Sequence, residues 1–567
     1  MVLYLEGNAV EAACDESLLS LVRREGLDAD TLRQKPLAAQ IGGEVYTLNF
    51  NPIHKTEQGE ELRSNVKKAG GRVKLLRYSD TMGRRVYERS LKYVVFMAIR
   101  RLWPQARVME HYSLGAGVYM TIEKTPSLCE ADLQLLEAEC RGIIQADLPL
   151  LRERLPIETA IDFYRGEGFA DKVRLLKWRQ FNYFDCYRQE DYLDYFYGEM
   201  TPSTGYVHVF GLQFVAPGML MLLPNDADPE RLGVYTHSPK LASVFAQSDN
   251  WGRLMRCDTV AELNAMVQDG SVRELVRINE ALHEKSYAQI ADAIVCRGAR
   301  AVMVAGPSSS GKTTSANRLY THLRVLGKSP VLLSLDNYYV DRDKLLPDES
   351  GEVDLEHIDA LDVARFNSDL ERLITGQEVE VPVFDFKTGR RAPQGLRIRV
   401  GEDEPLIIEG IHGLNPRMLS PAIHKDSVFR VYVSALTTLN LDDHNRIRTT
   451  DMRLLRRMVR DYETRGASVE HTFSMWSSVQ KGERVWIFPF QEEADALFNT
   501  TLVYELAVLK KHIFPLLLKV QPESEYYADA HGIIKFLNYV QDADIEDEIP
   551  PTSILREFIG GNTFYRE

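Results

Sequence analysis

The chain has 567 residues and a formal net charge of −14, with 44% hydrophobic and 26% charged residues. Because this length exceeds what one hydrophobic core usually supports, we expect about three or four domains in a globular protein. The acidic balance disfavours a general nucleic-acid binder, since nucleic-acid phosphates attract basic surfaces. The six cysteines contain no Cys-x-x-Cys pair, which argues against a zinc site and fits a reducing compartment.

Nothing in the sequence indicates export or a membrane span. The N-terminus lacks a basic segment followed by an apolar one, and no apolar run approaches the ~18 residues of a spanning helix. We therefore expect a cytoplasmic protein without membrane contact. The sequence leaves open whether the protein forms a homo-oligomer.

Residues 1–78 predict a small α+β module. Residues 2–5, 45–50 and 72–78 are strand-like, and residues 17–25 are helical up to a stop at Gly26. A second α+β unit is expected over residues 79–265. It starts with a helix at 86–102 that Pro104 ends, and strand-like runs at 206–214 and 219–223 follow an aromatic-rich middle.

A connecting helix is expected over residues 266–298, and a third unit over residues 299–510 alternates strands with helices. Strands are expected at 301–305, 330–335, 406–408 and 428–433, and helices at 314–325 and 361–375. Continuous apolar strands in this order predict a parallel sheet covered by helices on both faces. Residues 511–567 are expected to be a C-terminal extension that packs on this unit. The predicted fold class is a multidomain α/β and α+β protein.

A phosphate-binding loop follows the first strand of the third unit. The segment AVMVAGPSSSGKTTSA contains Gly306-x4-Gly311-Lys312-Thr313, the full P-loop pattern, between a strand and a helix. Glycines let backbone amides wrap phosphates, and the helix N-terminus adds positive charge. We expect Lys312 to reach the transferring phosphate and Thr313 to bind Mg²⁺. The expected ATP-binding residues are Gly306, Ser308, Ser309, Ser310, Gly311, Lys312, Thr313 and Thr314.

Two carboxylates follow neighbouring strands of the predicted sheet. Asp336 ends the strand in LLSLDNYY, and Glu409 ends the strand in LIIEGIHGL. Ligands of open α/β sheets bind at this edge. Asp336 could accept the proton of an attacking hydroxyl or hold a Mg²⁺-bound water, and the alternative is a strand-end or helix-capping aspartate.

A basic helix is the third feature of this unit. Arg453, Arg456, Arg457 and Arg460 recur at three- and four-residue spacing in DMRLLRRMVRDYETRG, and Arg465 follows them. A mobile lid helix with these arginines would neutralise charge on a transferring phosphoryl group. The alternative for any single arginine is a solvated face paired with nearby acidic residues.

From about residue 301 to 509 the chain resembles the uridine kinase and phosphoribulokinase family. The motifs that carry the resemblance are GPSSSGKTT, LDNYY, PVFDF, IEGIHGL and RLLRRMVRDYETRG, in family order. The resemblance implies a P-loop kinase that uses ATP and Mg²⁺ to phosphorylate a sugar hydroxyl, for a nucleoside the 5′-hydroxyl. It implies that Asp336 is the general base, that Glu409 associates with Mg²⁺, and that Arg453 and Arg456 are lid arginines.

The substrate-binding residues implied by this resemblance are Glu356, Phe384 and Arg391. Glu356 aligns with a ribose-binding aspartate of the family. Phe384 and Gly389 stand where uridine-cytidine kinases have a Tyr and a His that contact the base, and basic residues lie nearby. A nucleoside is the favoured acceptor, and a substrate with an anionic group, such as a sugar phosphate, is the alternative.

The N-terminal half resembles threonyl-tRNA synthetases, from a ubiquitin-like TGS module into an editing-type domain. The segments VKLLRYSDTMGRRVYERSLKYVVFMAIRRLWP and DYFYGEMTPSTG carry the resemblance. The four positions that hold His and Cys in the synthetases are here Arg89, Tyr93, Phe196 and Met200. Zinc binding and deacylation are therefore not expected. We expect a binding or regulatory scaffold with an aromatic cleft lined by Tyr93 and Phe196.

Residues 63–107 are locally basic, with only Asp80 and Glu88 opposing thirteen Lys and Arg residues. A solvated surface is favoured here, and an RNA-contacting face is the alternative. The latter belongs to a different class of function, a nucleotide-switched regulator that senses RNA or an amino acid.

Overall fold

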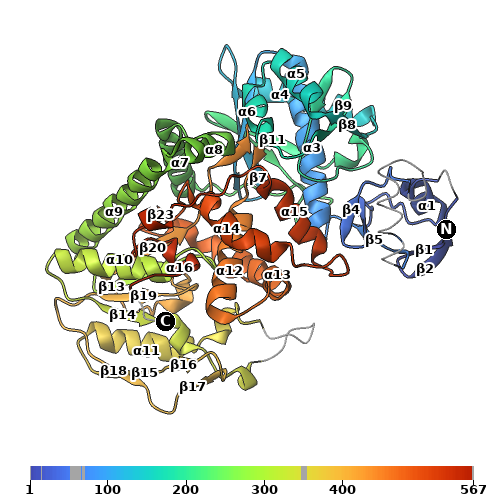
Figure 1. Cartoon of the computed structure of the whole chain (residues 1–567). Helices are drawn as coiled ribbons and strands as arrows, with labels where there is room; N and C mark the ends of the chain where they lie inside the picture. The colour runs from blue at the N-terminus through green and yellow to red at the C-terminus, as the bar shows by residue number, and fades with distance from the viewer. Residues whose placement is uncertain (1, 14–15, 52–65, 67–69, 346–353, 565–567) are drawn as a thin grey trace.

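The computed structural model describes residues 2–13, 16–51, 66, 70–345 and 354–564. Figure 1 shows the small N-terminal module at one side of the molecule, joined through the long helix α3 to the remainder. Its mixed sheet has the order β2-β1-β5-β3-β4, in which β1 and β5 are parallel. The elements are β1 (Val2–Leu5), β2 (Asn8–Glu11), α1 (Leu18–Arg24), β3 (Ala38–Ile41), β4 (Glu44–Tyr46) and β5 (Arg72–Leu76).

Helix α3 (Thr81–Leu102) is the central element of the second unit. Fourteen of its residues are buried, which explains why its sequence lacks a clear polar stripe. The antiparallel sheets β11-β12-β7-β6 and β10-β9-β8 accompany it. Their strands are β6 (Arg107–Leu114), β7 (Gly117–Glu123), β8 (Arg152–Pro156), β9 (Tyr183–Gln189), β10 (Tyr192–Asp194), β11 (Gly211–Val215) and β12 (Gly218–Leu222).

The expected strand at 206–214 is only partly right. Residues Thr204–Val207 form a 3-10 turn, and the strand begins at Gly211. The Thr204 side chain bonds the Leu148 amide and the Ile143 carbonyl, which ties this turn to the end of α4 (Glu130–Gln145). The remaining helices of the unit are α5 (Ile157–Gly166), α6 (Ala170–Leu176), α7 (Pro239–Met255) and α8 (Val260–Asp269).

The kinase-like unit has the predicted parallel sheet, in the order β14-β19-β13-β20-β23. Its strands are β13 (Ala301–Ala305), β14 (Val331–Ser334), β19 (Leu406–Glu409), β20 (Val428–Ser434) and β23 (Ala496–Asn499), and the helices near it include α9 (Val272–Arg297), α10 (Lys312–Val325) and α11 (Val363–Ile374). The prediction of a parallel α/β sheet is confirmed. Two short hairpins, β15 (Val379–Val381) with β18 (Leu396–Ile398) and β16 (Phe384–Asp385) with β17 (Arg390–Arg391), lie between α11 and β19.

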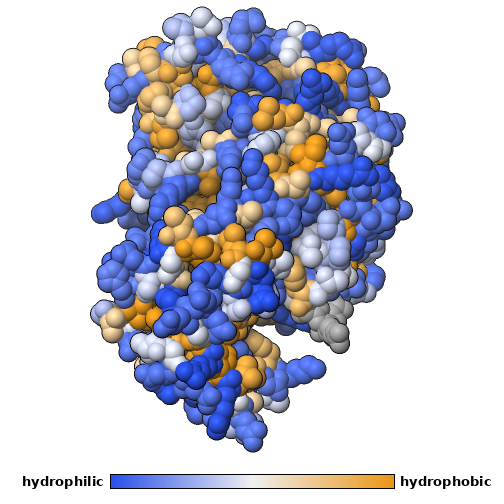
Figure 2. Space-filling view, turned by 90° about the vertical axis from the view of Figure 1, so that its left-hand side faces the viewer, coloured by the Kyte–Doolittle hydropathy of each residue, from blue (hydrophilic) through white to orange (hydrophobic). Residues whose placement is uncertain are grey.

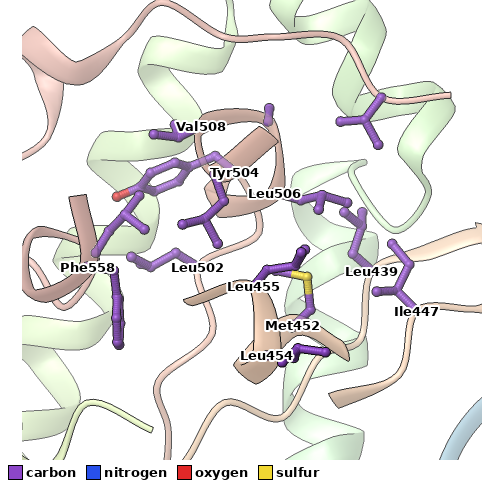
Figure 3. Packing of buried hydrophobic residues seen from close by; sticks show 14 of the residues in the cluster. Leu439, Ile447, Met452, Leu454, Leu455, Leu502, Tyr504, Leu506, Val508 and Phe558 are labelled. Carbon is purple, nitrogen blue, oxygen red and sulfur yellow. The ribbon is translucent and has the colours of Figure 1, made fainter. Parts of the chain in front are cut away.

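One hydrophobic cluster joins the second unit, the kinase-like sheet and the C-terminal extension. Figure 3 shows Met452 and Leu455 of α12 (Thr449–Arg465) below Leu506 of α14 (Glu505–Leu517). Phe558 of α16 (Arg556–Ile559) lies on the side of Leu502 in the same view. The other C-terminal helices are α13 (Val469–Trp486) and α15 (Tyr527–Leu537). Because the cluster crosses the expected boundaries, the kinase-like unit shares its core with its neighbours.

A buried set of charges lies at the junction of the second and third units. Lys172 Nζ lies 3.0 Å from Asp194 and 3.3 Å from Asp442, and all three side chains are at most 1% exposed. His444 also contacts Asp194, at 2.6 Å. Asp442 and His444 belong to the hairpin of β21 (Asn440–Asp442) and β22 (Asn445–Arg446), directly before α12. The charges therefore fix α12 against the N-terminal half.

The face of the molecule next to α9 and α10 is mainly hydrophilic, with apolar side chains in small separate groups (Figure 2). Across the described ranges, none of the helices is both long and apolar enough to cross a lipid bilayer.

The Lys172 charge is open to a direct test. Lys172→Met should lower the free energy of unfolding by about 3–5 kcal/mol, because it leaves Asp194 and Asp442 buried without their counter-ion. Urea unfolding followed by circular dichroism measures the loss. The control is Arg165→Met, which removes an exposed pair with Asp162 and should change stability by less than about 1 kcal/mol. Equal effects of the two variants would contradict a structural role for the buried charges.

Candidate active site

The P-loop connects β13 to α10, and its glycines are sterically required. A Cβ on Gly306 would lie 2.0 Å from the Val433 carbonyl oxygen of the neighbouring strand. Gly311 has φ +85°, a conformation that other residues rarely adopt. Since α10 begins at Lys312, the first amides of this helix point back at the loop. The predicted strand, glycine loop and helix are thus present.

Lys312 and Thr313 stand at the entrance of this helix. The Lys312 ammonium donates to the Pro307 carbonyl at 3.0 Å, so it lies folded over the loop. Burial lowers the pKa of Lys312, while the negative charges of Glu409 and Asp336 act to raise it. Lys312 therefore lies close to both predicted carboxylates. The Thr313 side chain is exposed at the mouth of the loop.

Asp336 and Glu409 lie at the same edge of the sheet because β14 and β19 are adjacent and parallel, with Ser334 opposite Glu409. The Ser334 hydroxyl donates to Glu409 at 2.7 Å. Burial raises the pKa of Glu409 to about 7, and the charge of Asp336 contributes to that rise. Burial also raises the pKa of Asp336, which Lys312, Arg465 and Arg460 oppose. The two carboxylates and Lys312 thus form one half-buried charge cluster.

Two glutamates accept hydrogen bonds from donor groups of the P-loop. Glu483 of α13 accepts from the Ser308 amide at 2.9 Å. Glu557 of α16 accepts from the Thr314 hydroxyl at 2.7 Å and from its amide at 3.4 Å. Phosphate oxygens bind such donors at helix N-termini. The loop is therefore built for anions, and carboxylates hold two of its positions here.

The arginine helix α12 packs against the loop with Arg453 and Arg456 buried, and is not an exposed lid over it, which corrects the expected placement. Arg453 and Arg456 are 1% and 0% exposed. Arg453 donates to Glu483 at 2.7 Å and to the Ser308 carbonyl at 3.1 Å. Arg456 pairs with Glu505. The burial follows from these internal counter-ions, which the sequence pattern did not show, and contact of either arginine with a phosphoryl group stays a prediction.

The three predicted substrate residues have different surroundings. Burial raises the pKa of Glu356 to about 7, followed by the charge of Glu483, while Arg457 and Lys312 lower it. Glu356 thus belongs to the charge cluster of the loop. Phe384 is 8% exposed and packs with Tyr339, at 5.6 Å between ring centroids.

Arg391 holds the loop that carries Asp336. Its guanidinium donates to the carbonyls of Tyr339 and Tyr338, each at 2.9 Å, and to Asp362 at 3.1 Å. Most of its hydrogen-bonding capacity is used by the protein itself. The structure therefore gives Arg391 a positioning role, and its contact with a substrate stays a prediction.

Glu483 and Glu557 are the residues that sequence reasoning missed. Glu483 follows in the helix after the arginines, and Glu557 lies in the C-terminal extension. No local motif marks either one. His412 of the IEGIHGL segment was also not singled out. It is 1% exposed, and burial lowers its pKa to about 4, so it lies neutral near Glu356 and Lys312.

The four N-terminal positions that replace the synthetase His and Cys residues are not one aromatic cleft. Tyr93 and Met200 are fully buried, and the Tyr93 hydroxyl donates to the Tyr187 carbonyl. Only Arg89 and Phe196 line a cavity. The expected cleft is corrected accordingly, because Tyr93 packs inside the unit. In the part of the chain that is described, no group of three or more His, Cys, Asp or Glu side chains is placed to hold a metal ion alone.

The comparisons with known proteins concern this C-terminal region. The model of the Phosphoribulokinase / Uridine kinase family matches residues 301–506. A uridine kinase from Staphylococcus haemolyticus is 30% identical over 195 residues, which cover 34% of this chain and 84% of that protein. The chain belongs to the phosphoribulokinase and uridine kinase family.

Further relatives are similar to the same part of the chain. A uridine kinase from Brevibacillus brevis is 29% identical over 195 residues, 34% of this chain and 81% of that protein. Among solved structures, a possible uridine kinase from Bacillus stearothermophilus is 17% identical, over 38% of this chain and 98% of that one, with a TM-score of 0.27. Enzymes of this family use ATP with Mg²⁺.

The raised pKa of Glu409 gives a pH-dependent prediction. A carboxyl with a higher pKa in the folded than in the unfolded chain stabilises the fold less as pH rises from 4.5 to about 7. Glu409→Gln removes this titration, so the melting temperature of the variant relative to the unsubstituted protein should be higher at pH 8 than at pH 5. The difference should be about 1 °C for each kcal/mol in a chain of 567 residues. Differential scanning calorimetry without nucleotide measures it. The exposed Glu402→Gln should show no such trend, and a pH-independent difference for Glu409→Gln would contradict the assignment.

Glu557 of the C-terminal extension is expected to compete with nucleotide phosphates for the donors of Thr314. Glu557→Ala frees the Thr314 donors and removes a negative charge, so MgADP should bind about 10- to 100-fold more tightly, the equivalent of one charge-assisted hydrogen bond. Calorimetric titration measures the affinity. Glu523→Ala, an exposed glutamate of the same extension, is the control. Unchanged affinity in Glu557→Ala would show that its carboxylate does not compete for the phosphate position.

Proposed function

We propose that the protein transfers the γ-phosphoryl group of MgATP to a hydroxyl of a small molecule, with a nucleoside as the favoured acceptor. The observation that carries the proposal is the half-buried group of Lys312, Asp336 and Glu409 at the strand ends beside the P-loop. Family membership supports the phosphotransferase class. The relatives are named uridine kinases, which supports a nucleoside 5′-hydroxyl as acceptor.

The residues present fit ATP and Mg²⁺. The amides of Ser308 and Thr314 already bind carboxylates, so the loop accepts anions once those glutamates withdraw. The expected ATP-binding residues are those named from the P-loop pattern. Thr313 and Glu409 would hold Mg²⁺, which usually keeps water and phosphate oxygens among its ligands and needs few protein groups. When bound, the metal neutralises charge on the phosphates.

Asp336 is the proposed general base. Burial raises its pKa, which makes the carboxylate a stronger proton acceptor than an exposed aspartate. Lys312 opposes that rise and would keep Asp336 ionised while it orients the reacting groups. Arg391 fixes the backbone of the Asp336 loop through the carbonyls of Tyr338 and Tyr339. Arg460 and Arg465, whose charges act on Asp336, join Arg453 and Arg456 as candidates for stabilising the transferred group.

Glu356 and Phe384 are the proposed contacts of the molecule that accepts the phosphoryl group. Glu356, with a pKa of about 7, could accept hydrogen bonds from the hydroxyls of a ribose. Phe384 offers an apolar ring and no hydrogen bond to a base. A second candidate, a sugar phosphate, is favoured by Lys387 and Arg390, which are exposed on the same hairpin region.

The N-terminal half is proposed to be a binding scaffold related to the TGS and editing-type domains of threonyl-tRNA synthetases, with boundaries at residues 78 and 265. Its mixed α/β content supports this relation. Several arginines of the basic segment are paired, among them Arg77, Arg84 and Arg101. These pairs favour a solvated surface over an RNA-contacting face. A cytoplasmic location belongs to the same proposal.

The assignment of the base is tested by Asp336→Asn. We expect turnover to fall about 10²- to 10⁴-fold while MgADP affinity stays within a few-fold, because the variant loses proton acceptance and not the P-loop. The control is Asp343→Asn, an exposed residue further along the same loop, which should retain turnover. Full activity of Asp336→Asn would rule out the assigned base.

The acceptor is tested by a substrate panel. ATP consumption is measured with uridine, cytidine, inosine and adenosine, and with ribose 5-phosphate and fructose 6-phosphate. Nucleoside-dependent consumption supports the proposal, and consumption with phosphorylated sugars alone supports the second candidate. Consumption with no hydroxyl acceptor, together with measurable affinity for RNA or an amino acid, would instead support the nucleotide-switched regulator.

A further inference from the structure

A cavity of about 150 Å³ lies away from the P-loop, where four parts of the chain meet. Its walls come from β4 of the N-terminal module, α3 of the second unit, the start of α12 and the C-terminal helix α15. Figure 1 shows α15 beside the lower end of α3, close to β4. The cationic side chains that line it are Arg85, Arg89, Lys92, Arg446, Arg448 and Lys535, against the carboxylates of Glu44, Glu199 and Asp451.

Each of the three lining carboxylates already has its own partner. Glu44 contacts His531 at 3.0 Å, and Asp451 contacts Arg85 at 2.8 Å. The Glu199 carboxylate pairs with Arg152, at 2.6 Å, outside the cavity. The lining acids therefore leave cationic charge unmatched inside the cavity.

Arg89 carries that unmatched charge. Its Nε donates to the Glu199 backbone carbonyl at 3.0 Å, and among the described residues no carboxylate lies within 4.0 Å of its guanidinium. Other lining cations form ion pairs with two carboxylates that do not line the cavity. Glu88 pairs with Lys92 and Arg448, and Glu110 pairs with Lys92 and Arg446. Burial lowers the pKa of Arg89 to about 10, and the charges of Arg448 and Arg85 contribute to that fall. Arg89 thus lies near Arg85, which is paired with Asp451, and near Arg448, which is paired with Glu88, while it has no carboxylate of its own among the described residues.

The wall is shaped around the Arg89 guanidinium. A Cβ on Gly198 would lie 2.7 Å from Arg89 Cζ, so the guanidinium lies directly against the Gly198 backbone. Together with the Nε hydrogen bond to the Glu199 carbonyl, this contact limits where the terminal nitrogens can lie. A fixed planar fork is the arrangement that binds phosphate oxygens in pairs.

We propose that this cavity is a second anion site, which binds a phosphate group through Arg89 with Arg85 and Arg448. Phosphate suits it better than a carboxylate because it brings up to two negative charges and more acceptor oxygens to converging guanidiniums. The cavity volume is close to that of an engineered cavity that holds benzene, so the ligand is orthophosphate or the phosphate end of a small phosphomonoester.

The position of the site links it to the kinase unit. Arg448 directly precedes α12, the helix that carries Arg453 and Arg456 to the P-loop carbonyls. A ligand between Arg89 and Arg448 would join α3 to the first turn of that helix. The site goes beyond the proposed transfer reaction, since none of its residues contacts the P-loop.

The test uses the full chain with Lys312→Met as the parent, so that phosphate binding at the P-loop is removed. Isothermal titration with orthophosphate should detect one site, and Arg89→Met should weaken it about 10- to 100-fold, the loss of one charge-assisted contact. Arg84→Met is the matched control, since Arg84 lies on the same helix and pairs with Asp226. Absence of binding in the parent, or equal binding after Arg89→Met, would overturn the proposal.

A second measurement does not depend on the variant's folding. Hydrogen–deuterium exchange of the unsubstituted protein with 10 mM orthophosphate (an order-of-magnitude choice for a weak anion site) should slow exchange around residues 196–199 and 445–451. Protection confined to residues 306–314 would contradict the site. Titration with glycerol 3-phosphate then distinguishes the two possible ligands, a phosphomonoester and free phosphate. If glycerol 3-phosphate binds more tightly than orthophosphate, the ligand is a phosphomonoester; equal or weaker binding indicates free phosphate.

Discussion

The buried ammonium of Lys172 is the interaction on which the arrangement of this chain depends. It lies between Asp194 of the second unit and Asp442 of the hairpin before α12, with no access to water. Two carboxylates brought into a protein interior repel each other unless a cation lies between them. The position of the arginine helix, which contacts the P-loop carbonyls, is therefore set by a charge that comes from the N-terminal half.

The same electrostatic rule explains the buried charges of the candidate active site. Arg453 and Arg456 would be too costly to bury alone, and each is matched by a glutamate, Glu483 or Glu505. Glu483 serves twice, because it also accepts from the Ser308 amide. Arginines thus donate to carbonyls of the P-loop, and carboxylates accept from its amide and hydroxyl donors. Nucleotide phosphates enter a site that is already ordered for negative charge.

The sequence predicted what local patterns encode. Apolar strands, the glycine loop and the helix after it gave the parallel sheet, and strand ends placed Asp336 and Glu409 at one edge. Partners distant in the chain could not be found this way. Glu483 and Glu557 lie 175 and 243 residues from their P-loop partners, and no motif of their own marks them. Arg391 looked like a ligand-binding cation because backbone carbonyls, its actual partners, leave no trace in a sequence.

The buried charges at the junction of the second and third units have a consequence for how such a chain can change over evolution. Units joined by a linker can be exchanged one at a time, since little crosses the joint. Here a new N-terminal unit would have to supply a buried cation for Asp442 at the same place, together with the apolar residues of the shared core. The two halves are therefore constrained to vary as a pair, and recombination at this junction would give chains that carry an unneutralised aspartate in their interior.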